Sequence, residues 1–285
     1  MIYIFSLLGY GDCLITGSII ENMRHTTTSA CLVGTEFAAE TWGIMRIPLK
    51  PDVVLLSKTA SFFKIKSSNL VDIIHDFKIV RSFASFNIRE WDTVIFETPS
   101  DFRNHLLLLG TKCNAVTIKR RTNAYFDRSY VFSRYFGFHQ WYDSVSLSKN
   151  PNRILINPCA GDARRHISGA ALGVVLKVLN KIGVQTYLLD HKGAYGDFRS
   201  EVDVYMVKPT LVEAVNILRL SDFYIGPDSF FTHLAYYFKV PQLALFWKKD
   251  TYFEPPGLSR VGGLYYFDDL SENGLLEKKI FSLLS

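Results

Sequence analysis

Residues 221–235, with the sequence SDFYIGPDSFFTHLA, decide the fold class of this chain. The apolar run over residues 223–225 predicts a buried strand that ends at Gly226-Pro227. A helix is then predicted to open with polar residues crowded into its first turns: Asp228, Ser229, Thr232 and His233. A strand that leads through a short break into a helix is typical of parallel α/β domains.

The same alternation extends in both directions. In the second half, strands are predicted over residues 153–157, 184–189, 202–206 and 242–246, with helices over 168–182, 211–220 and 272–284. In the first half, strands are predicted over residues 2–8, 30–33, 53–56, 93–96 and 115–118, with helices over 12–23, 70–80 and 102–109. Residues 146–152 are polar, contain a proline and are typical of a linker. The sequence therefore predicts two α/β units with a ligand cleft where they join.

The helix that opens at Asp228 is a candidate anion site. The first N–H groups of a helix have no partner inside it, and the hydroxyls of Ser229 and Thr232 lie in the same turns. Structural alternatives stay open: Asp228 and Ser229 can form a helix cap, and His233 can be a core histidine. A buried pair of Phe230 and its neighbour could also anchor a helix that binds nothing.

Residues 157–168, NPCAGDARRHIS, form a second candidate loop after a predicted strand. The loop is small and polar from Asn157 to Gly161 and then delivers Arg164 and Arg165 before the next helix. Arginine offers a planar fork of donors that suits phosphate oxygens. The alternative is a pair of surface arginines.

The third candidate loop, residues 9–14, has the sequence GYGDCL. Its two glycines allow a tight turn and the close approach of another molecule to the backbone. Asp12 then lies near a helix N-terminus, where a negative charge is favourable, so an N-cap is the alternative to a catalytic role. Read as G-x-G-x-x-G, the loop lacks the third glycine because Leu14 occupies that position.

Composition excludes several classes of protein. Of the 285 residues, 48% are hydrophobic and 21% are charged, so the chain is neither disordered nor of low complexity. No apolar run approaches the roughly 18 residues of a spanning helix, and the N-terminus lacks the basic region of a signal peptide. The four cysteines are scattered without a C-x-x-C pair, which argues against disulfides and zinc. These features predict a cytoplasmic protein.

The formal net charge is +5, and a basic triplet, Lys119, Arg120 and Arg121, precedes a stretch rich in tyrosine and phenylalanine up to residue 136. Such a stretch can bind nucleic acid, anionic lipid headgroups or a charged glycan. The alternative is a solvated face above core aromatic residues.

Together, the three loops resemble the motifs of the glycosyltransferase family 9 heptosyltransferases of bacterial surface-polysaccharide assembly. Residues 11–16, GDCLIT, are similar to the G-D-x-L-x-T turn of that family, and residues 157–161 with the arginines that follow look like its H-P-G-A-G motif. Residues 221–241 follow most of its pattern A-D-x-x-x-G-x-D-S/T-G-x-x-H-x-A-A-x-x-x-x-P, which is the most specific of the three. The resemblance covers both predicted domains, although the first half matches only at its start.

The chain departs from the family pattern at three positions. Phe230 stands where the family has a glycine, and Asn157 and Cys159 replace its histidine and glycine. The chain is also shorter than typical members, mostly in the N-terminal half. These differences leave the nature of the donor open, including a nucleoside monophosphate sugar.

The resemblance implies an α/β fold of the GT-B type, with two Rossmann-like domains facing across a cleft. The expected domains are residues 1–148, which bind the acceptor, and residues 149–270, which bind a nucleotide-sugar donor. The final helix, residues 271–285, is expected to return to the N-terminal domain. No cofactor and no metal are expected.

The resemblance also implies roles for individual residues. Asp12 is the expected general base of an inverting, metal-independent glycosyl transfer. The expected acceptor-binding residues are Gly11, Lys119, Arg120 and Arg121. The expected donor-binding residues are Asn157, Gly161, Arg164, Arg165, Asp228, Ser229, Phe230, Thr232 and His233.

The partners implied are a nucleotide-sugar donor and a glycan or glycolipid acceptor of the surface-polysaccharide or lipopolysaccharide type. Peripheral contact with an anionic membrane surface, at the inner face of the cytoplasmic membrane, is expected from the basic stretch. Nucleic acid is not an expected partner, because the stretch lacks a recognisable binding module. Two alternatives stay open: a GT-B epimerase or hydrolase, and a non-catalytic nucleotide-sugar-binding subunit in which Phe230 blocks the phosphate site.

Overall fold

The computed structural model describes residues 1–6, 10–22, 30–34, 36–45, 53–55, 88–97, 112–136, 151–246, 251–260, 263–266 and 274–284. The chain divides into two compact units, Met1–Gln140 and Trp141–Ser285, a few residues before the expected boundary at residue 148. The helices expected at residues 70–80 and 102–109 lie outside the described residues, as does most of the expected linker. Within the described ranges, no helix combines the length and the apolar character needed to span a membrane.

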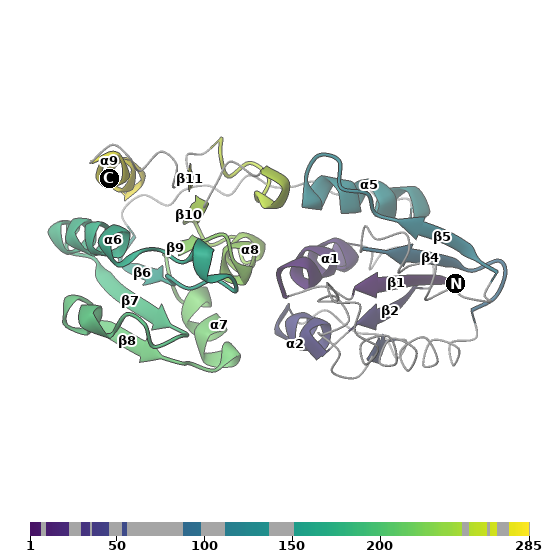
Figure 1. Ribbon diagram of the computed structural model, residues 1–285, viewed down its shortest axis with the longest axis horizontal. Helices are drawn as coiled ribbons and strands as arrows, with labels where there is room; N and C mark the ends of the chain where they lie inside the picture. Colours follow the sequence, from purple (N-terminus) through teal and green to yellow (C-terminus); the bar gives the residue numbers. More distant parts are fainter. Residues whose placement is uncertain are drawn as a thin grey trace. The chain divides into compact units, whose positions relative to one another are not determined.

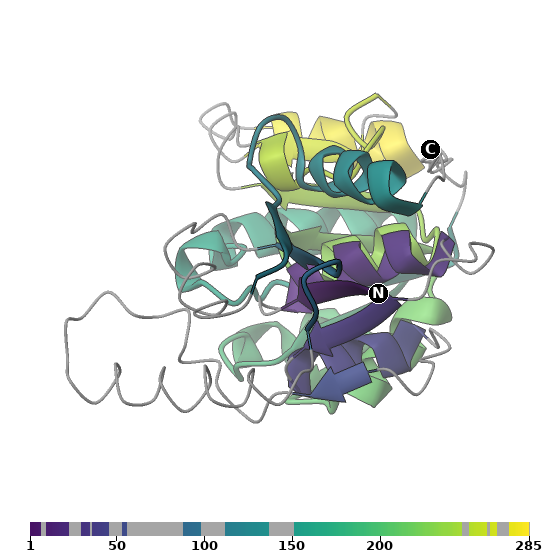
Figure 2. The same ribbon diagram turned by 90° about the vertical axis from the view of Figure 1, so that its right-hand side faces the viewer.

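In its described part, the first unit contains a parallel sheet of five strands in the order β3-β2-β1-β4-β5 (Figure 1). The strands are β1 (Ile2–Ser6), β2 (Ala30–Gly34), β3 (Val53–Leu55), β4 (Thr93–Phe96) and β5 (Asn114–Thr117). The helices are α1 (Tyr10–Asn22), α2 (Glu36–Met45) and α5 (Ala124–Phe136). Helix α1 contacts both α2 and α5, so the three helices lie side by side, as Figure 2 shows.

Apolar side chains on both faces of this sheet form the core of the first unit. All five residues of β1 are buried, as expected for a parallel strand covered on both sides. Phe5 stacks on Phe96 of the neighbouring strand β4, with ring centroids 5.1 Å apart. Trp42 of α2 is fully buried, and its indole N–H donates to the Cys13 carbonyl of α1 at 3.1 Å. The core therefore fixes the start of α1 beside the carboxyl ends of β1 and β4.

The described part of the second unit contains a parallel sheet of six strands in the order β11-β10-β9-β6-β7-β8. The strands are β6 (Arg153–Ile156), β7 (Gln185–Asp190), β8 (Val204–Val207), β9 (Phe223–Pro227), β10 (Gln242–Phe246) and β11 (Leu264–Tyr266). The helices are α6 (Gly169–Ile182), α7 (Leu211–Arg219), α8 (Phe230–Tyr237) and α9 (Leu275–Leu284), with short 3₁₀ turns at Ala163–Arg165, Gly196–Glu201 and Thr251–Phe253.

Local capping signals set the bounds of the helices in the second unit. The hydroxyl of Ser168 accepts from the Ala171 N–H at the start of α6, and Gly183 ends that helix with φ of 80°. Thr210 and Glu213 form a reciprocal capping box at the start of α7. These caps explain why both helices begin and end within a residue or two of the predicted positions.

The final helix belongs to the second unit, which corrects the expectation that it returns to the N-terminal domain. Helix α9 packs on α6 (Figure 1), and its buried face carries Leu276, Ile280, Leu283 and Leu284. These leucine and isoleucine side chains join the same core cluster as Leu172 and Leu176 of α6. The apolar spacing i, i+4, i+7 and i+8 accounts for an amphipathic helix, but it does not say which apolar surface the helix covers.

Candidate functional site

In the second unit, the candidate loops lie at the carboxyl ends of adjacent strands. Strand β6 pairs with β9, and the Asn157 N–H that follows β6 donates to the Ile225 carbonyl at 3.0 Å. Strand β9 pairs with β10, and the Asp228 N–H that follows β9 donates to the Leu245 carbonyl at 3.1 Å. The loop at residues 157–168 is therefore held next to the start of α8, which is the usual place for a ligand on a parallel sheet.

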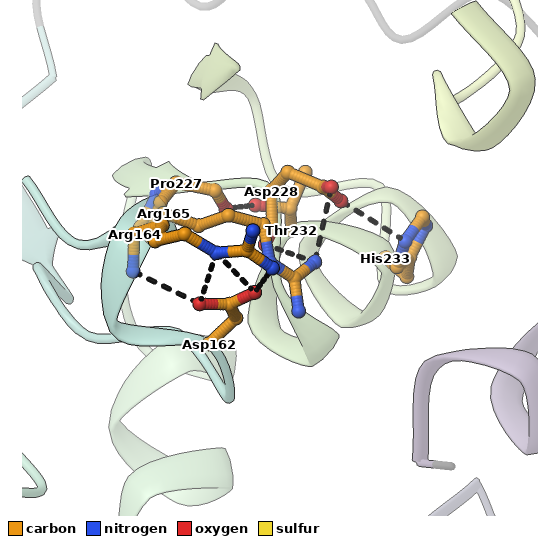
Figure 3. A network of polar contacts seen from close by, with 7 residues as sticks. All are labelled: Asp162, Arg164, Arg165, Pro227, Asp228, Thr232 and His233. Atoms are coloured by element: carbon orange, nitrogen blue, oxygen red, sulfur yellow. Dashed lines mark hydrogen bonds and ion pairs between the residues drawn. The ribbon is translucent and has the colours of Figure 1, made fainter. Parts of the chain in front are cut away.

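Arg165 links these two loops. One guanidinium nitrogen, Nη1, donates to both the carbonyl and the Oδ2 atom of Asp228, at 3.0 and 3.1 Å (Figure 3). On the other side of Asp228, Oδ1 lies 3.9 Å from Nε2 of His233, an ion pair when the histidine is protonated. The Arg165 side chain is 36% exposed, so it holds the carboxylate and still offers N–H groups to a ligand.

The neighbouring Arg164 takes a different direction. Its guanidinium binds Asp162, the N-cap of the same 3₁₀ turn, with Nη2 and Oδ2 2.5 Å apart, and the side chain is 81% exposed. Hydrogen bonds from the Arg164 side chain and N–H lower the pKa of Asp162 to about 2. Of the two predicted donor-binding arginines, the structure brings only Arg165 to the start of α8.

The start of α8 is built around Ser229. Its backbone occupies the N-cap position, but its side chain makes no capping hydrogen bond, and among the described residues the buried hydroxyl has no partner. The N–H groups of Thr232 and His233 bind back to the Ser229 carbonyl at 3.2 and 3.4 Å. An anion at this terminus would therefore meet the N–H groups that precede Thr232.

Four of the predicted donor-binding residues are buried: Asn157, Ser229, Thr232 and His233. Thr232 is fully buried and donates its hydroxyl hydrogen to the Pro227 carbonyl, so it supports the turn into the helix. Asn157 is also buried, and its Oδ1 accepts from the Cys159 N–H at 3.2 Å, which shapes the loop after β6. Gly161 lies exposed in that loop, close to the Arg165 guanidinium.

A tyrosine that the sequence analysis did not single out lies beneath the turn. Tyr224 of β9 is fully buried, and a Cβ atom placed on Gly226 would overlap its phenol ring and hydroxyl. Both residues lie on the same face of β9 because they are two positions apart. Burial raises the pKa of the Tyr224 hydroxyl, which stays neutral. Glycine at position 226 is thus required by close packing against Tyr224.

This packing makes Gly226→Ala a test of the turn. We expect the variant to lose about 1–3 kcal/mol of unfolding free energy, because a new methyl group must displace a buried ring. Urea denaturation followed by circular dichroism measures the loss. Gly173→Ala on α6, where the new Cβ would make ordinary contacts of 3.8 Å with Phe198, is the matched control and should not destabilise the unit. Equal stabilities of the two variants would contradict the packing argument.

Phe230, one of the three residues that depart from the family pattern, packs against a neighbouring aromatic ring. Its ring lies edge-on to Phe231 with centroids 5.6 Å apart, and Phe231 in turn lies 5.3 Å from the ring of His191 at the end of β7. The non-glycine residues with positive φ in the described chain are Lys208 and Lys239, so the backbone of Phe230 does not require glycine.

In the first unit, Asp12 lies in the first turn of α1 and is bound by an arginine from α5. Nη2 of Arg128 donates to Oδ1 of Asp12 at 2.6 Å, and Nε of Arg128 lies 3.4 Å from Oε1 of Glu97. Glu97 directly follows β4, so the three side chains meet at the carboxyl end of the first sheet. We call Asp12, Arg128 and Glu97 the unit-one triad. Neither Glu97 nor Arg128 was among the predicted site residues.

The remaining predicted acceptor residues lie on the same unit. Gly11 is in the first turn of α1, next to Asp12. Residues 119–121 follow β5 and are exposed, and the Arg121 N–H donates to Oδ2 of Asp127 at 2.7 Å. Asp127 thereby anchors the basic loop to α5. Across the residues that the structure describes, no three histidine, cysteine or acidic side chains gather in a group that could hold a metal ion.

Comparison with solved structures identifies the fold. The E. coli heptosyltransferase WaaC, solved with ADP-2-deoxy-2-fluoro heptose, superposes with a TM-score of 0.64 at 12% identity over 93% of this chain and 92% of that one. A family 9 glycosyltransferase from Veillonella parvula gives a TM-score of 0.63 at 12% identity, with 99% and 95% covered. The chain has the GT-B fold. This confirms the fold class that the sequence predicts.

Other GT-B structures are similar at the same low level of identity. The E. coli ADP-heptose lipopolysaccharide heptosyltransferase II matches with a TM-score of 0.61 at 12% identity, covering 99% of this chain and 98% of that one. No profile of a known protein family matches the sequence, and no curated protein matches it. At this identity, the likeness establishes the GT-B fold, and the activity has to be argued from the site.

Proposed function

We propose that the protein is an inverting, metal-independent glycosyltransferase that moves a sugar from a nucleotide-sugar donor to a surface-polysaccharide or lipopolysaccharide-type acceptor. The observation that carries the proposal is the position of Arg165 beside the N-terminus of α8, at the carboxyl end of the second GT-B sheet. Two of the structurally similar proteins support it, because they are heptosyltransferases and one of them was solved with an ADP-heptose analogue.

The donor phosphate would bind at the start of α8. Arg165 supplies a guanidinium, and the first N–H groups of the helix supply further donors. Together these groups would stabilise the negative charge that develops on the leaving phosphate as the bond to the sugar breaks. Positive charge from the protein thus takes the part that a metal ion plays in other transferases.

The acceptor would be activated in the first unit. The Asp12 carboxylate is 23% exposed, so a hydroxyl can reach it, and it would take the proton of that hydroxyl as the hydroxyl oxygen attacks the sugar. Gly11 lets the acceptor approach the backbone beside Asp12. The basic residues Lys119, Arg120 and Arg121 would bind acidic groups of the acceptor.

A membrane-bound acceptor would fit the surface around this basic loop. The next helix, α5, exposes Phe126 and Tyr130, at 49% and 65%, one turn apart on the same face. Cationic and aromatic side chains together favour the headgroup region of an anionic bilayer. We propose peripheral binding at the cytoplasmic face of the membrane, which co-sedimentation with phosphatidylglycerol vesicles against phosphatidylcholine vesicles tests.

The first experiment identifies the donor. The purified protein is melted in the presence of ADP, GDP, UDP, dTDP, CMP and their sugar conjugates. A ligand bound only by the folded protein adds about 2.7 kcal/mol at a hundredfold excess over its dissociation constant. The best donor is then incubated with glycan acceptors, and release of the nucleotide together with a glycosylated product is measured. Absence of any nucleotide-dependent stabilisation would contradict the proposed function.

The two adjacent arginines give an internal comparison for donor binding. We expect Arg165→Ala to weaken binding of the donor nucleotide by about 1.5–3 kcal/mol, because a charge-assisted contact is lost. Arg164→Ala is the matched control and should bind almost as the parent does, since its guanidinium faces Asp162. Isothermal titration calorimetry with the same nucleotide measures both. A larger loss in Arg164→Ala would mean that the phosphate lies on the other side of the loop.

One alternative reaction has its own support. A putative UDP-N-acetylglucosamine 2-epimerase from Listeria monocytogenes shares the fold, with a TM-score of 0.50 at 12% identity over 98% of this chain and 90% of that one. An epimerase or a hydrolase would convert the nucleotide sugar without an acceptor. Product formation in acceptor-free reactions therefore separates this alternative from glycosyl transfer.

A further inference from the structure

The arginine of the unit-one triad is buried between two acidic side chains. The Arg128 side chain is 3% exposed, that of Glu97 is fully buried, and that of Asp12 is 23% exposed. Arginine is almost never buried unless its charge is paired, and removing it from water has a large cost in free energy. An apolar side chain at this position of α5 would fill the core equally well. The buried arginine therefore indicates a role other than packing.

We propose that Arg128 is the positioning residue of Asp12, and that Glu97 fixes the guanidinium in the orientation this requires. The inference rests on the proposed function, in which Asp12 is the general base. In the described part of the chain, Asp12 has a single hydrogen bond, from Arg128 to Oδ1. The second carboxylate oxygen, Oδ2, is left to accept the proton of the acceptor hydroxyl.

Three contacts fix the orientation of the guanidinium plane. Nη2 donates to Asp12 of α1, Nε donates to Glu97 at the end of β4, and Nη1 donates to the Ala124 carbonyl of its own helix at 3.2 Å. Each nitrogen therefore has a partner on a different element. A planar fork can satisfy the three directions at once, whereas the point charge of a lysine cannot.

Glu97 is the fully buried member of the unit-one triad. Oε1 faces Arg128, and among the described residues the buried Oε2 has no hydrogen-bond partner. Burial raises the pKa of Glu97 to about 7. The positive charge of Arg128 lowers this pKa, and the negative charge of Asp12 raises it. Among the described residues, the groups that face Glu97 are Asp12 and Cys13 from α1, Ser6 from β1 and Arg128 from α5. Burial also raises the pKa of the Cys13 thiol, which stays neutral.

Kinetics of four variants test the positioning role. Arg128→Met, Arg128→Lys, the double variant Arg128→Met with Glu97→Gln, and the control Arg89→Met are assayed with the donor and acceptor that the parent uses. In the double variant, a neutral amide replaces the buried Glu97 carboxyl that Arg128→Met leaves without its cation. We expect the kcat of the double variant to fall about 100-fold with the donor KM unchanged, because Asp12 is no longer held in place. Arg128→Lys should recover part of the rate, and the exposed Arg89→Met should behave as the parent.

A retained kcat in the folded double variant would overturn the inference. So would a rise in donor KM with unchanged kcat, which would make Arg128 a donor-binding residue. If the parent itself transfers no sugar with any donor and acceptor, the proposed function fails. A second measurement, which does not depend on the reaction, then decides whether the three side chains of the triad interact.

That measurement is the infrared band of the neutral Glu97 carboxylic acid, identified by its loss in Glu97→Gln and followed against pH. In Arg128→Met the midpoint should move to higher pH, because the cation that favours the ionised form is gone. In Asp12→Asn it should move to lower pH, because the neighbouring negative charge that raises the pKa of Glu97 is gone. A midpoint unchanged in both variants would overturn the inference without reference to the reaction.

Discussion

Asp12→Asn is expected to lower the rate of glycosyl transfer by a factor of about 10² to 10⁴, the usual cost of removing a general base. The asparagine keeps the size of the side chain and can still contact Arg128, but it cannot accept a proton from the acceptor hydroxyl. The start of α1 is fixed by the core around Trp42, so the loss should lie in the chemical step. Single-turnover kinetics with the donor identified in the thermal screen measure the effect.

Donor binding provides the control for this variant. The donor is proposed to bind at α8 in the second unit, so calorimetry should give the same affinity for Asp12→Asn and the parent. Glu90→Gln, which removes an exposed carboxylate from the same unit, should keep the full rate. Near-parental transfer by Asp12→Asn would remove Asp12 from the role of base, and the search would turn to other carboxylates.

The second large effect concerns stability and pH. The pKa of Glu97 is 4.5 in its ordinary state and is raised to about 7 by burial in the folded protein. The native state therefore binds the Glu97 proton more tightly than the unfolded chain does, and this contribution to stability is complete below pH 4.5. It is lost as the pH rises through 7. The difference corresponds to about 3 kcal/mol of unfolding free energy.

Glu97→Gln isolates this contribution, because glutamine has the same shape and does not titrate. Urea denaturation of the parent and the variant at intervals from pH 4.5 to 8.5 gives two curves. The unfolding free energy of the parent should fall relative to that of Glu97→Gln as the pH rises. Glu90→Gln should run parallel to the parent, since its side chain is exposed in the folded protein. Parallel curves for the parent and Glu97→Gln would show that Glu97 is ionised in both states.

Local patterns in the sequence predict most of the fold. Strands such as β1 and β4 are short apolar runs, and such runs predict buried strands without knowledge of the neighbouring strand. Ser168 and Thr210 mark the starts of helices, because their side chains form capping hydrogen bonds within one turn of the chain. The order of the strands in each sheet and the position of α9 depend on contacts between distant parts of the chain. No local pattern encodes those contacts.

The candidate site shows the same division. The motifs predict Asp12, Arg165 and Asp228 as site residues, and all three lie at the carboxyl ends of strands. The motifs do not include Arg128 and Glu97, because the role of these residues depends on contacts between distant parts of the chain. Arg128 is 116 residues from Asp12 and 31 residues from Glu97 in the sequence. One signal was available: α5 places Arg128 on the same helical face as the buried Ala124, Tyr125, Phe132 and Phe136. A charged residue within an apolar helical face has to find a partner in the interior.

The packing of α9 on α6 also sets the order in which the second unit can fold. Leu276 and Ile280 come from the last described helix, whereas their neighbours on α6 belong to the first α-helix that the structure describes in the unit. A chain emerging from the ribosome presents α6 early and must leave part of its apolar surface uncovered until α9 has been made. The second unit can therefore complete its core only after synthesis has reached the last helix, and a chain stopped before residue 275 would keep that surface open to aggregation.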